Sequence, residues 1–389
     1  MPTTAEPGED QLSRICRFIP EPTSHERHRS GSRREEILDY VAEAVRSAPA
    51  TPLLEVTVPV GDRPRTLLLK LDGRSRWGSI KARTALALLA SVAGRIGPDS
   101  TVVESTSGNL GVALAGICRE LGIAFTAVVD SRLAPAMLER ITANGARVLS
   151  ADGDCPPDDS RHLQRRIALV QRILAENPAA VWTNQYENPA NVAVHRWWTG
   201  HELDRQMDGG VQAVFAPVST GGTFVGIRAC LEAARPELEC VAVDVDGSTI
   251  FGGPPKGRLL TGIGASKPST FLESAGRPRH VMVSDAEAIT ACRALAEDLG
   301  VRVGGSSGAT IAGALRVLHR RPDLTRVACI CPDLGANYEQ TLYDDAWLLE
   351  RGVTEIDGRP VIGGCKAVFT GQRPDRRREG APTGLAEYR

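Results

Sequence analysis

The feature that most constrains the fold of this chain is a repeated alternation of strand and helix patterns between about residues 52 and 331. Short apolar runs alternate with stretches whose apolar residues recur at helical spacing. Strands that alternate with helices in this way favour βαβ units and mainly parallel sheets. The sequence therefore predicts an α/β fold that binds ligands at the carboxyl ends of its strands.

The predicted elements cover most of the chain. Predicted strands are 52–59, 66–71, 101–104, 124–129, 147–149, 180–182, 211–216, 239–243, 280–283 and 326–331, and predicted helices are 33–46, 81–93, 109–121, 135–144, 160–176, 191–206, 223–234, 285–299 and 307–318. The composition of residues 1–32 and 353–389 predicts a flexible amino-terminal extension and a loose carboxyl-terminal tail.

Composition excludes several classes of protein. The 389 residues carry a net charge of -1, without a basic face for nucleic acid. No apolar run is long enough to cross a bilayer, and the polar start, Met1 to Asp10, does not resemble a secretory signal. The nine cysteines are odd in number and scattered, without metal-ligand spacing. We expect a reduced, cytoplasmic protein without structural metal.

One lysine stands at a predicted helix start. The stretch Gly78-Ser79-Ile80-Lys81 follows the apolar run 67–71 and opens the helix 81–93. The helix dipole and a dry pocket would both lower the pKa of Lys81, which would then be able to form a Schiff base. A lone lysine in this position can equally be a solvated surface residue.

Three predicted strand-to-helix turns carry small polar residues. The turn Ser219-Thr220-Gly221-Gly222-Thr223 is typical of a phosphate-binding turn (the cup), because its glycines, amides and hydroxyls can surround an anion. It lacks the P-loop lysine and the dinucleotide glycine pattern, so a monophosphate is favoured over a nucleotide. The alternative is a helix cap. The turn 105–111 offers hydroxyls and amides that suit a carboxylate, and 304–308 offers serines that would cap a helix or donate to a ring nitrogen.

Together these turns and the lysine suggest a cofactor. A Schiff-base lysine, a monophosphate cup and a neutral hydroxyl for a ring nitrogen form a pyridoxal 5'-phosphate site. A neutral hydroxyl restrains electron delocalisation into the ring, which suits β-elimination and replacement better than transamination.

From about residue 56 to 349 the chain resembles the cysteine synthase-like family, the fold type II (tryptophan synthase β-like) pyridoxal phosphate enzymes. The resemblance rests on the motifs Gly78–Lys81, Thr106–Gly111 and Gln185–Asn191. Ala82 stands where aspartate is usual, Arg76-Trp77 where Asn-Pro is usual, Tyr186 where phenylalanine is usual, and Ser219 where most cysteine synthases have glycine.

The resemblance implies two open-sheet α/β lobes with the cofactor in the cleft between them. The large cofactor-binding lobe would comprise 33–81 and 187–352, the small mobile lobe 82–186, and two copies would form a homodimer. The implied catalytic residue is Lys81, which would also hold the cofactor. The implied cofactor-binding residues are Lys81, Asn109, Ser219, Thr220, Gly221, Gly222, Thr223 and Ser306, with Ser307 as second choice for the ring nitrogen. The implied substrate-binding residues are Ser105, Thr106, Ser107, Gly108, Asn109, Gln185 and Tyr186.

Within the family, the stretches 104–111, 216–220 and 343–348 resemble a branch that condenses O-phospho-L-serine with L-glutamate in 2,3-diaminopropionate and siderophore biosynthesis. The resemblance implies a transferase that releases phosphate by β-replacement. One alternative is a cysteine synthase that uses O-acetylserine or O-phosphoserine with sulfide. Others are a dehydratase or threonine synthase, and a scaffold protein without catalysis.

Four further polar residues are given structural roles. We expect His195 to pack in the core, Asp333 to cap a helix or form a turn, and Arg83 and Arg132 to form surface salt bridges.

Overall fold

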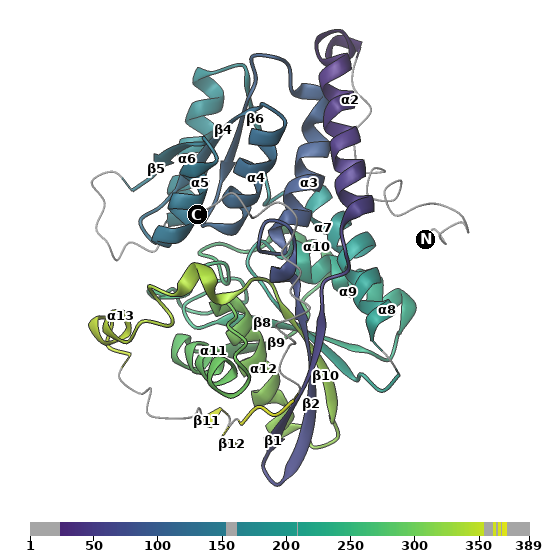
Figure 1. The fold of residues 1–389 in the computed structure, drawn as a ribbon, viewed down its shortest axis with the longest axis vertical. Helices are drawn as coiled ribbons and strands as arrows, with labels where there is room; N and C mark the ends of the chain where they lie inside the picture. Colours follow the sequence, from purple (N-terminus) through teal and green to yellow (C-terminus); the bar gives the residue numbers. More distant parts are fainter. Residues whose placement is uncertain are drawn as a thin grey trace.

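The computed structural model describes residues 24–152, 162–207, 209–353, 361–362, 365–366 and 368–371. Within these residues a six-stranded sheet has the order β1-β2-β10-β7-β8-β9, a four-stranded sheet has the order β5-β4-β3-β6, and β11 (Val361–Ile362) pairs with β12 (Cys365–Lys366). Figure 1 shows the four-stranded sheet with its helices above the six-stranded one. The α/β fold with two open sheets is confirmed.

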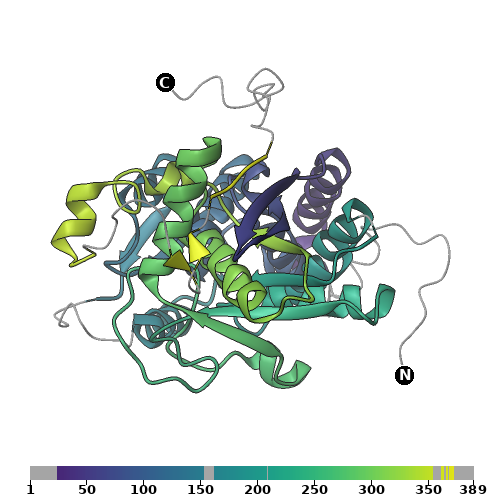
Figure 2. The ribbon, with the colours of Figure 1, turned by 90° about the horizontal axis from the view of Figure 1, so that it is seen from below.

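The large sheet is mainly parallel. β1 (Leu53–Val60) and β2 (Arg63–Leu71) form an antiparallel hairpin, and β10 (Arg326–Cys331), β7 (Ala213–Pro217), β8 (Glu239–Val245) and β9 (Arg279–Val283) follow in parallel. α11 (Asp285–Leu299) packs on α12 (Gly305–Arg320), which contacts β7 to β10, and Figure 2 shows these helices lying over one side of the sheet. Helix α9 (Gly222–Ala234) also packs on β7. Because helices cover them, the central strands β7 and β10 are almost entirely buried and read as unbroken apolar runs.

The small sheet is entirely parallel. Its strands are β3 (Thr101–Ser105), β4 (Ala124–Val129), β5 (Arg147–Ser150) and β6 (Ala180–Trp182). They alternate with α4 (Asn109–Glu120), α5 (Pro135–Ala143) and α6 (His162–Glu176). Helix α3 (Lys81–Val92) packs against α4 and against α2 (Ser24–Ser47). These bounds lie within a few residues of the predicted ones, except that α2 begins well before residue 33.

The predicted single helix 191–206 is wrong in its middle. It divides into α7 (Ala190–Val194), the π-helical segment η3 (His195–Gly200) and α8 (His201–Gln206). Close packing against α9 accompanies the change: a Cβ at Gly200 would lie 2.6 Å from Cβ of Cys230, and one at Gly226 would lie 2.4 Å from the carbonyl oxygen of Val192. Widened turns of this kind occur often at functional sites.

Several short elements escaped sequence prediction because they are too short to show a periodic pattern. They are η1 (Asp72–Arg74), η2 (Ala93–Arg95), α10 (Thr270–Ala275), η4 (Gly335–Tyr338) and α13 (Asp345–Glu350). In the segment predicted as a loose tail, Phe369 is buried and Thr370 exchanges backbone hydrogen bonds of 2.7 and 2.8 Å with Thr57 of β1. This contact covers part of the open edge of the large sheet.

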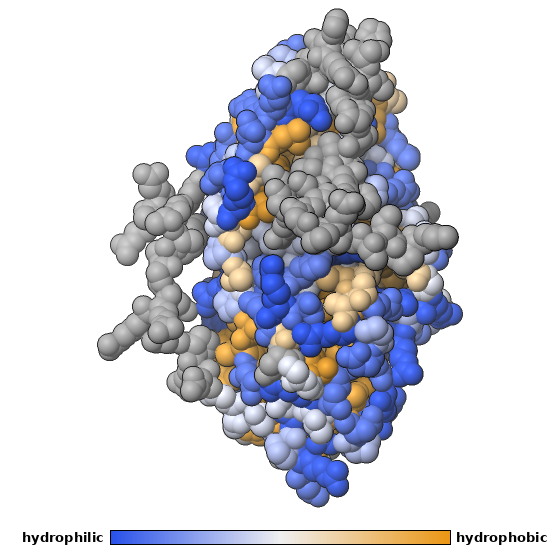
Figure 3. All heavy atoms as spheres, turned by 90° about the vertical axis from the view of Figure 1, so that its right-hand side faces the viewer, coloured by the Kyte–Doolittle hydropathy of each residue, from blue (hydrophilic) through white to orange (hydrophobic). Residues whose placement is uncertain are grey.

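The described surface is mixed in character. On the face drawn in Figure 3, hydrophilic residues separate the hydrophobic areas that the grey atoms leave visible. Leu138 and Leu349 are the large apolar side chains exposed among the described residues. Within the same residues, no helix combines the length and the apolar character that crossing a membrane requires.

A buried cluster of charges joins β2, α3 and α8. The ammonium group of Lys70 pairs with Glu202, and the Arg83 guanidinium lies 2.8 Å from Glu202 and 3.3 Å from Asp72. Burial alone would raise the pKa of Glu202. The positive charges of Arg83 and Lys70 outweigh burial and lower the pKa to about 2. The prediction of a surface salt bridge for Arg83 is therefore wrong in its location, because α3 is buried along almost its whole length.

Replacing Glu202 should destabilise the protein strongly. Glu202→Ala would leave Lys70 and Arg83 buried without their shared partner, and breaking a buried ion pair in this way costs about 3–5 kcal/mol of unfolding free energy. Urea unfolding followed by tryptophan fluorescence measures the loss. Glu43→Ala, which removes an exposed ion pair with Arg46, is the matched control and should cost at most about 1 kcal/mol. Equal losses in the two variants would contradict this account of the cluster.

Candidate active site

The carboxyl ends of strands from both sheets face one another and enclose two adjoining pockets. The lysine pocket is lined by Ile80, Lys81, Thr106, Ser107, Asn109, Leu110, Met137, Gln185, Pro217, Ser219, Thr220, Gly221, Thr223, Thr261, Gly262, Ser306, Pro332 and Tyr338. The arginine pocket is lined by Ser107, Arg132, Leu163, Arg166, Gln185, Tyr186, Ser219, Thr220, Arg258, Leu260, Thr261, Gly262, Ile263, Gly264, Ala265, Ser266, Lys267, Pro268, Ser269 and Thr270. Residues such as Ser107, Gln185 and Ser219 line both, so the two pockets are continuous.

Lys81 is the first residue of α3 and reaches the lysine pocket. The preceding turn is held by Gly78, whose φ is 78°, and by a 2.7 Å hydrogen bond that the Ile80 amide donates to the carbonyl of Pro332, just beyond β10. Burial lowers the pKa of the Lys81 amine to about 8, against the opposing pull of Asp333 and Asp72. With a pKa of about 8, roughly a tenth of the amine is neutral at pH 7, far more than for an ordinary lysine, and only the neutral form acts as a nucleophile or base.

The turn 219–223, which the sequence predicts to hold a phosphate, leads from β7 into α9. Gly221 has a left-handed φ of 89°, and α9 begins at Gly222. A Cβ at Gly221 would lie 2.4 Å from Oγ of Ser269, and one at Gly222 would lie 2.5 Å from the Asn191 side chain. The amides at the start of α9 and the hydroxyls of Thr220 and Thr223 can thus approach an anion closely.

In the turn 105–111 some polar residues stabilise the turn itself, and others line the lysine pocket. Oγ1 of Thr106 accepts hydrogen bonds of 3.0 Å from the amides of Gly108 and Gly111, and the Ser105 hydroxyl lies 3.0 Å from that of Tyr186. These contacts hold the turn itself. Ser107 and Asn109 line the lysine pocket together with Gln185, whose amide donates to the carbonyl of Ser105 at 2.6 Å. Ser107, Asn109 and Gln185 therefore reach the pocket in which a substrate carboxylate is predicted to bind, and a hydrogen bond already orients each of the side-chain amides of Asn109 and Gln185.

Glu104 is a buried carboxyl group that sequence reasoning did not single out. It accepts from the amides of Ser105 at 2.9 Å and Gln185 at 3.2 Å, and from the side chains of Trp182 and Thr183. Burial raises the pKa of Glu104 to about 7. An acidic residue directly after the apolar pair Val102-Val103 was the available signal. Glu104 joins β3 to the segment after β6, and the residues predicted to bind a carboxylate follow these two strands.

The far end of the lysine pocket is built from Ser306 and the segment after β10. Ser306 lines the pocket, whereas Ser307 is fully buried and donates to the carbonyl of Asp333 at 3.2 Å. The sequence predicts that Asp333 caps a helix or forms a turn, and the prediction of a cap is wrong. Asp333 is buried, and the residue that caps the following helix η4 is Leu334, which makes no side-chain hydrogen bond there. The backbone of Asp333 forms an isolated antiparallel β-bridge with that of Ser79, close to Lys81 in the sequence.

His195 does more than fill the core. It is fully buried, and its ring nitrogens lie 2.9 Å from the hydroxyl of Thr84, 3.0 Å from that of Thr199 and 3.2 Å from that of Thr223. Burial holds its pKa well below the usual value, so the ring is neutral. His195 therefore ties the helix of Lys81 to the cup.

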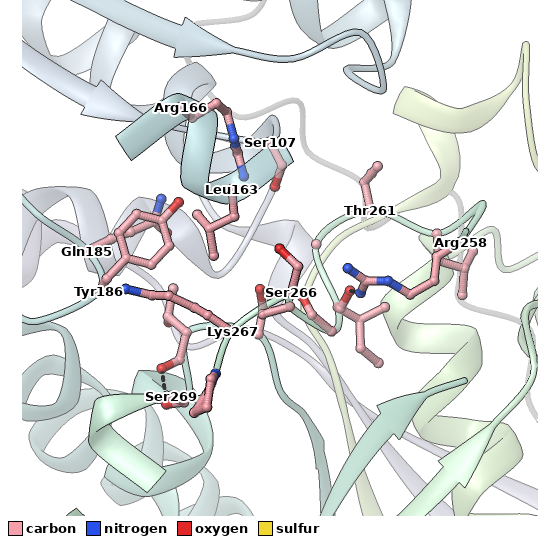
Figure 4. Close-up of a pocket in the computed structure, with 18 of the residues that line it drawn as sticks. Ser107, Leu163, Arg166, Gln185, Tyr186, Arg258, Thr261, Ser266, Lys267 and Ser269 are labelled. Atoms are coloured by element: carbon pink, nitrogen blue, oxygen red, sulfur yellow. Dashed lines mark hydrogen bonds between the residues drawn. The ribbon is translucent and has the colours of Figure 1, made fainter. Parts of the chain in front are cut away.

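The arginine pocket gathers cations from separate parts of the chain. Arg166 on α6 is buried, and although its Nε lies 3.1 Å from Asp130, its Nη1 has no hydrogen-bond partner. Arg132 pairs with the same aspartate at 3.1 Å, so its expected salt bridge exists at the rim of this pocket. Figure 4 shows Arg166 reaching down beside Ser107, with Arg258 extending from the other side near Thr261. Burial lowers the pKa of Arg258, and the nearby charge of Arg132 lowers it further. Cations held this close favour an anion between them.

The residues of the lysine pocket fit pyridoxal phosphate. A poorly solvated lysine amine suits an aldehyde, the glycine cup suits a phosphate, and the hydroxyl of Ser306 suits a pyridine nitrogen. The fold and this pocket define a fold type II pyridoxal phosphate enzyme. The family described as pyridoxal-phosphate dependent enzyme matches residues 45–333, and the chain belongs to it.

Several individual proteins are similar to this chain in sequence or in structure. An N-(2-amino-2-carboxyethyl)-L-glutamate synthase of Ralstonia nicotianae is 37% identical over 313 residues, covering 79% of this chain and 91% of the relative. The enzyme of the same name from Cupriavidus metallidurans is 37% identical over 327 residues, with coverage of 82% and 95%. Among solved structures, an O-acetylserine dependent cystathionine β-synthase from Helicobacter pylori has a TM-score of 0.69 at 26% identity, covering 77% of this chain and 97% of its own. An O-ureido-L-serine synthase has a TM-score of 0.70 at 25% identity, with coverage of 79% and 98%.

The uptake of pyridoxal phosphate by the cofactor-free protein should depend on pH through Lys81. Only the neutral amine attacks the aldehyde, so the rate should rise about tenfold per pH unit below pH 8 and level off above it. Stopped-flow absorbance at the band of lysine-linked cofactor measures this rate. Lys81→Ala should never develop the band, whereas Lys256→Ala, which alters an exposed lysine, should behave as the unaltered protein. A pH-independent rate, or the band in Lys81→Ala, would refute the assignment.

Proposed function

We propose that this enzyme joins the amino nitrogen of L-glutamate to Cβ of O-phospho-L-serine, releasing phosphate and forming N-(2-amino-2-carboxyethyl)-L-glutamate. The observation that carries the proposal is the arginine pocket beside the lysine pocket. Both substrates bear an anionic group beyond the amino-acid core, and relatives at 37% identity carry the name of this product's synthase.

Lys81 has two tasks in this reaction. When bound, pyridoxal phosphate supplies an aldehyde that links to amines and a ring that takes up the electron pair left at Cα. Lys81 would hold this group through its amine at rest, and the amine would be free to act as a base once substrate is bound. Its neutral amine then removes the proton from Cα, and the bond from Cβ to the phosphate oxygen breaks with its electron pair on phosphate. After the glutamate nitrogen has bonded to Cβ and lost a proton, Lys81 returns the proton to Cα.

The turns orient the phosphoserine. Ser107, Asn109 and Gln185 would bind the α-carboxylate, Thr106 would hold the turn that carries the first two, and Ser306 would face the ring nitrogen. Ser219 stands where both pockets meet, and its hydroxyl donates to the carbonyl of Gly264 at 3.2 Å. With Tyr186 and the unpartnered Nη1 of Arg166, it forms a polar wall suited to the departing phosphate.

Arg258 is suited to a distal carboxylate of glutamate. Its Nη1 donates to the carbonyl of Ile263 at 2.9 Å, which points the guanidinium along the wall of the arginine pocket. Arg132 stands near enough to affect its pKa, so a carboxylate between them would relieve a repulsion. Lys267, whose ammonium lies 5.5 Å from the centre of the Tyr186 ring, adds positive charge to the lining of the same pocket.

The second candidate is a cysteine synthase that uses sulfide. Support for this candidate is that the similar H. pylori structure is named an O-acetylserine dependent enzyme, and O-acetylserine is one of the two donors of this candidate reaction. Sulfide is small and carries no carboxylate, so it would leave Arg132 and Arg258 without a function. The arginine pocket therefore favours the glutamate reaction.

We also propose the setting of the reaction. The enzyme acts as a homodimer in the cytoplasm and supplies the precursor of 2,3-diaminopropionate for a siderophore or a peptide natural product. The small lobe, residues 82–186, closes on the large one during turnover, because a reactive acceptor at Cβ must be kept from water.

Product analysis tests the proposed reaction. Holoenzyme incubated with O-phospho-L-serine and L-glutamate should yield N-(2-amino-2-carboxyethyl)-L-glutamate and one equivalent of phosphate, identified by mass spectrometry and phosphate assay. Replacing glutamate with sulfide, or phosphoserine with O-acetylserine, should lower the rate at least tenfold. Faster formation of cysteine would favour the second candidate, and pyruvate or threonine formed without a nucleophile would favour a lyase.

Arg258→Gln should weaken glutamate binding selectively. Losing a charge-assisted hydrogen bond costs about 1.5–3 kcal/mol, which corresponds to a rise of roughly ten- to a hundredfold in KM for L-glutamate. KM for O-phospho-L-serine should change less than threefold. Arg351→Gln, at an exposed arginine of α13's end, is the control and should alter neither. An unchanged KM for glutamate would remove Arg258 from the nucleophile site.

A further inference from the structure

Asp333 makes a direct hydrogen bond between the parts of the chain that carry the two sheets. It follows β10 of the large sheet, and its Oδ2 accepts from Nδ2 of Asn109, the first residue of α4 beside the small sheet, at 2.7 Å. Asp333 itself does not line the lysine pocket, whereas Asn109 does. The carboxyl group therefore has a hydrogen-bonded route to the pocket through the asparagine, beside the charge by which it opposes the lowering of the Lys81 pKa.

The surroundings hold the Asp333 carboxyl group in one place. Oδ2 also accepts from the hydroxyl of Tyr338 at 2.6 Å. The backbone carbonyl of Asp333 accepts from the amide of Gly304 at 3.1 Å, and a Cβ at Gly304 would lie 2.1 Å from Oδ1. Glycine at 304 is thus required by the position of this carboxyl group. Oδ1 is buried and has no hydrogen-bond partner.

This arrangement determines which way the Asn109 amide faces. An asparagine side chain has a donor end and an acceptor end of nearly equal shape. With the amide reversed, Oδ1 of Asn109 would meet Oδ2 of Asp333, which already accepts from Tyr338, and two acceptors would be buried against each other. Asn109 must therefore turn its NH2 group toward Asp333. The second N–H of that group remains available to the lysine pocket.

We propose that Asp333 is a positioning residue that forces Asn109 to present an N–H donor, rather than its carbonyl oxygen, to the bound cofactor. A donor in that place stabilises an anionic oxygen on the cofactor ring, whereas a carbonyl would repel it. The inference concerns cofactor binding alone, so it stands or falls independently of which nucleophile the enzyme uses.

Asp333→Asn tests the proposal without substrates. An amide at 333 keeps the shape but offers a donor as well as an acceptor, so Asn109 is no longer held in one orientation. The dissociation constant of pyridoxal phosphate should rise at least tenfold, and the absorption spectrum should shift toward the form with a neutral ring hydroxyl. Asp244→Asn is the matched control: Asp244 is likewise buried, with one oxygen unpartnered and the other accepting from the amide of Val245 at 2.8 Å. It should leave affinity and spectrum unchanged, and equal effects in both variants would overturn the proposal.

A double variant separates positioning from a merely structural role. In an Asn109→Ala background, Asp333→Asn should change cofactor affinity less than twofold, because the residue it acts through is gone. Additive effects in the double variant would overturn the proposal. If Asp333→Asn does not fold, as judged by circular dichroism, Asn109→Ala alone decides the question: its spectrum should shift in the same direction, and an unshifted spectrum would overturn the proposal, which requires the Asn109 donor to act on the cofactor.

Discussion

The withdrawal of the Lys81 amine from water is the constraint on which the rest of the site depends. An ammonium group is costly to bury, and here burial lowers the pKa of Lys81 to about 8. The protein achieves this by placing the start of α3 against the end of β10, where the amide of Ile80 bonds to Pro332. The turns 219–223 and 105–111 and Ser306 lie around this one amine. A fully solvated Lys81 would keep the ordinary high pKa of a lysine and would be a poor nucleophile in their midst.

Other buried charges support this pocket, each in a different electrostatic state. Glu202 is kept ionised by Lys70 and Arg83 beneath α3, while burial raises the pKa of Glu104 to about 7 and also raises that of Asp333. Buried charged groups lower the stability of a protein core unless they are hydrogen-bonded. Here each of these groups joins two elements that are distant in sequence: Glu202 joins β2 with α8, Glu104 joins β3 with β6, and Asp333 joins β10 with α4.

The two pockets divide the chemistry. The lysine pocket has the small neutral donors that fold type II enzymes use for a cofactor and an amino acid, and the chain belongs to the pyridoxal-phosphate dependent enzyme family. The arginine pocket gathers positive charge, on which we base the proposal of an anionic second substrate rather than sulfide. Substrate choice within a shared scaffold would thus arise from residues outside the reacting centre.

The sequence by itself determined the α/β alternation, the lysine at a helix start and the glycine cup, because periodicity and local backbone requirements are written in neighbouring residues. It also predicted Ser107, Asn109 and Gln185, which do line the pocket, although their roles there remain predictions. The tertiary structure alone decided the π-helical segment at His195, the burial of Arg83, and the meeting of Arg132, Arg166 and Arg258. It also decided that Asp333 bonds Asn109 across the sheets. These features depend on distances between residues far apart in the chain, and no local pattern encodes such distances.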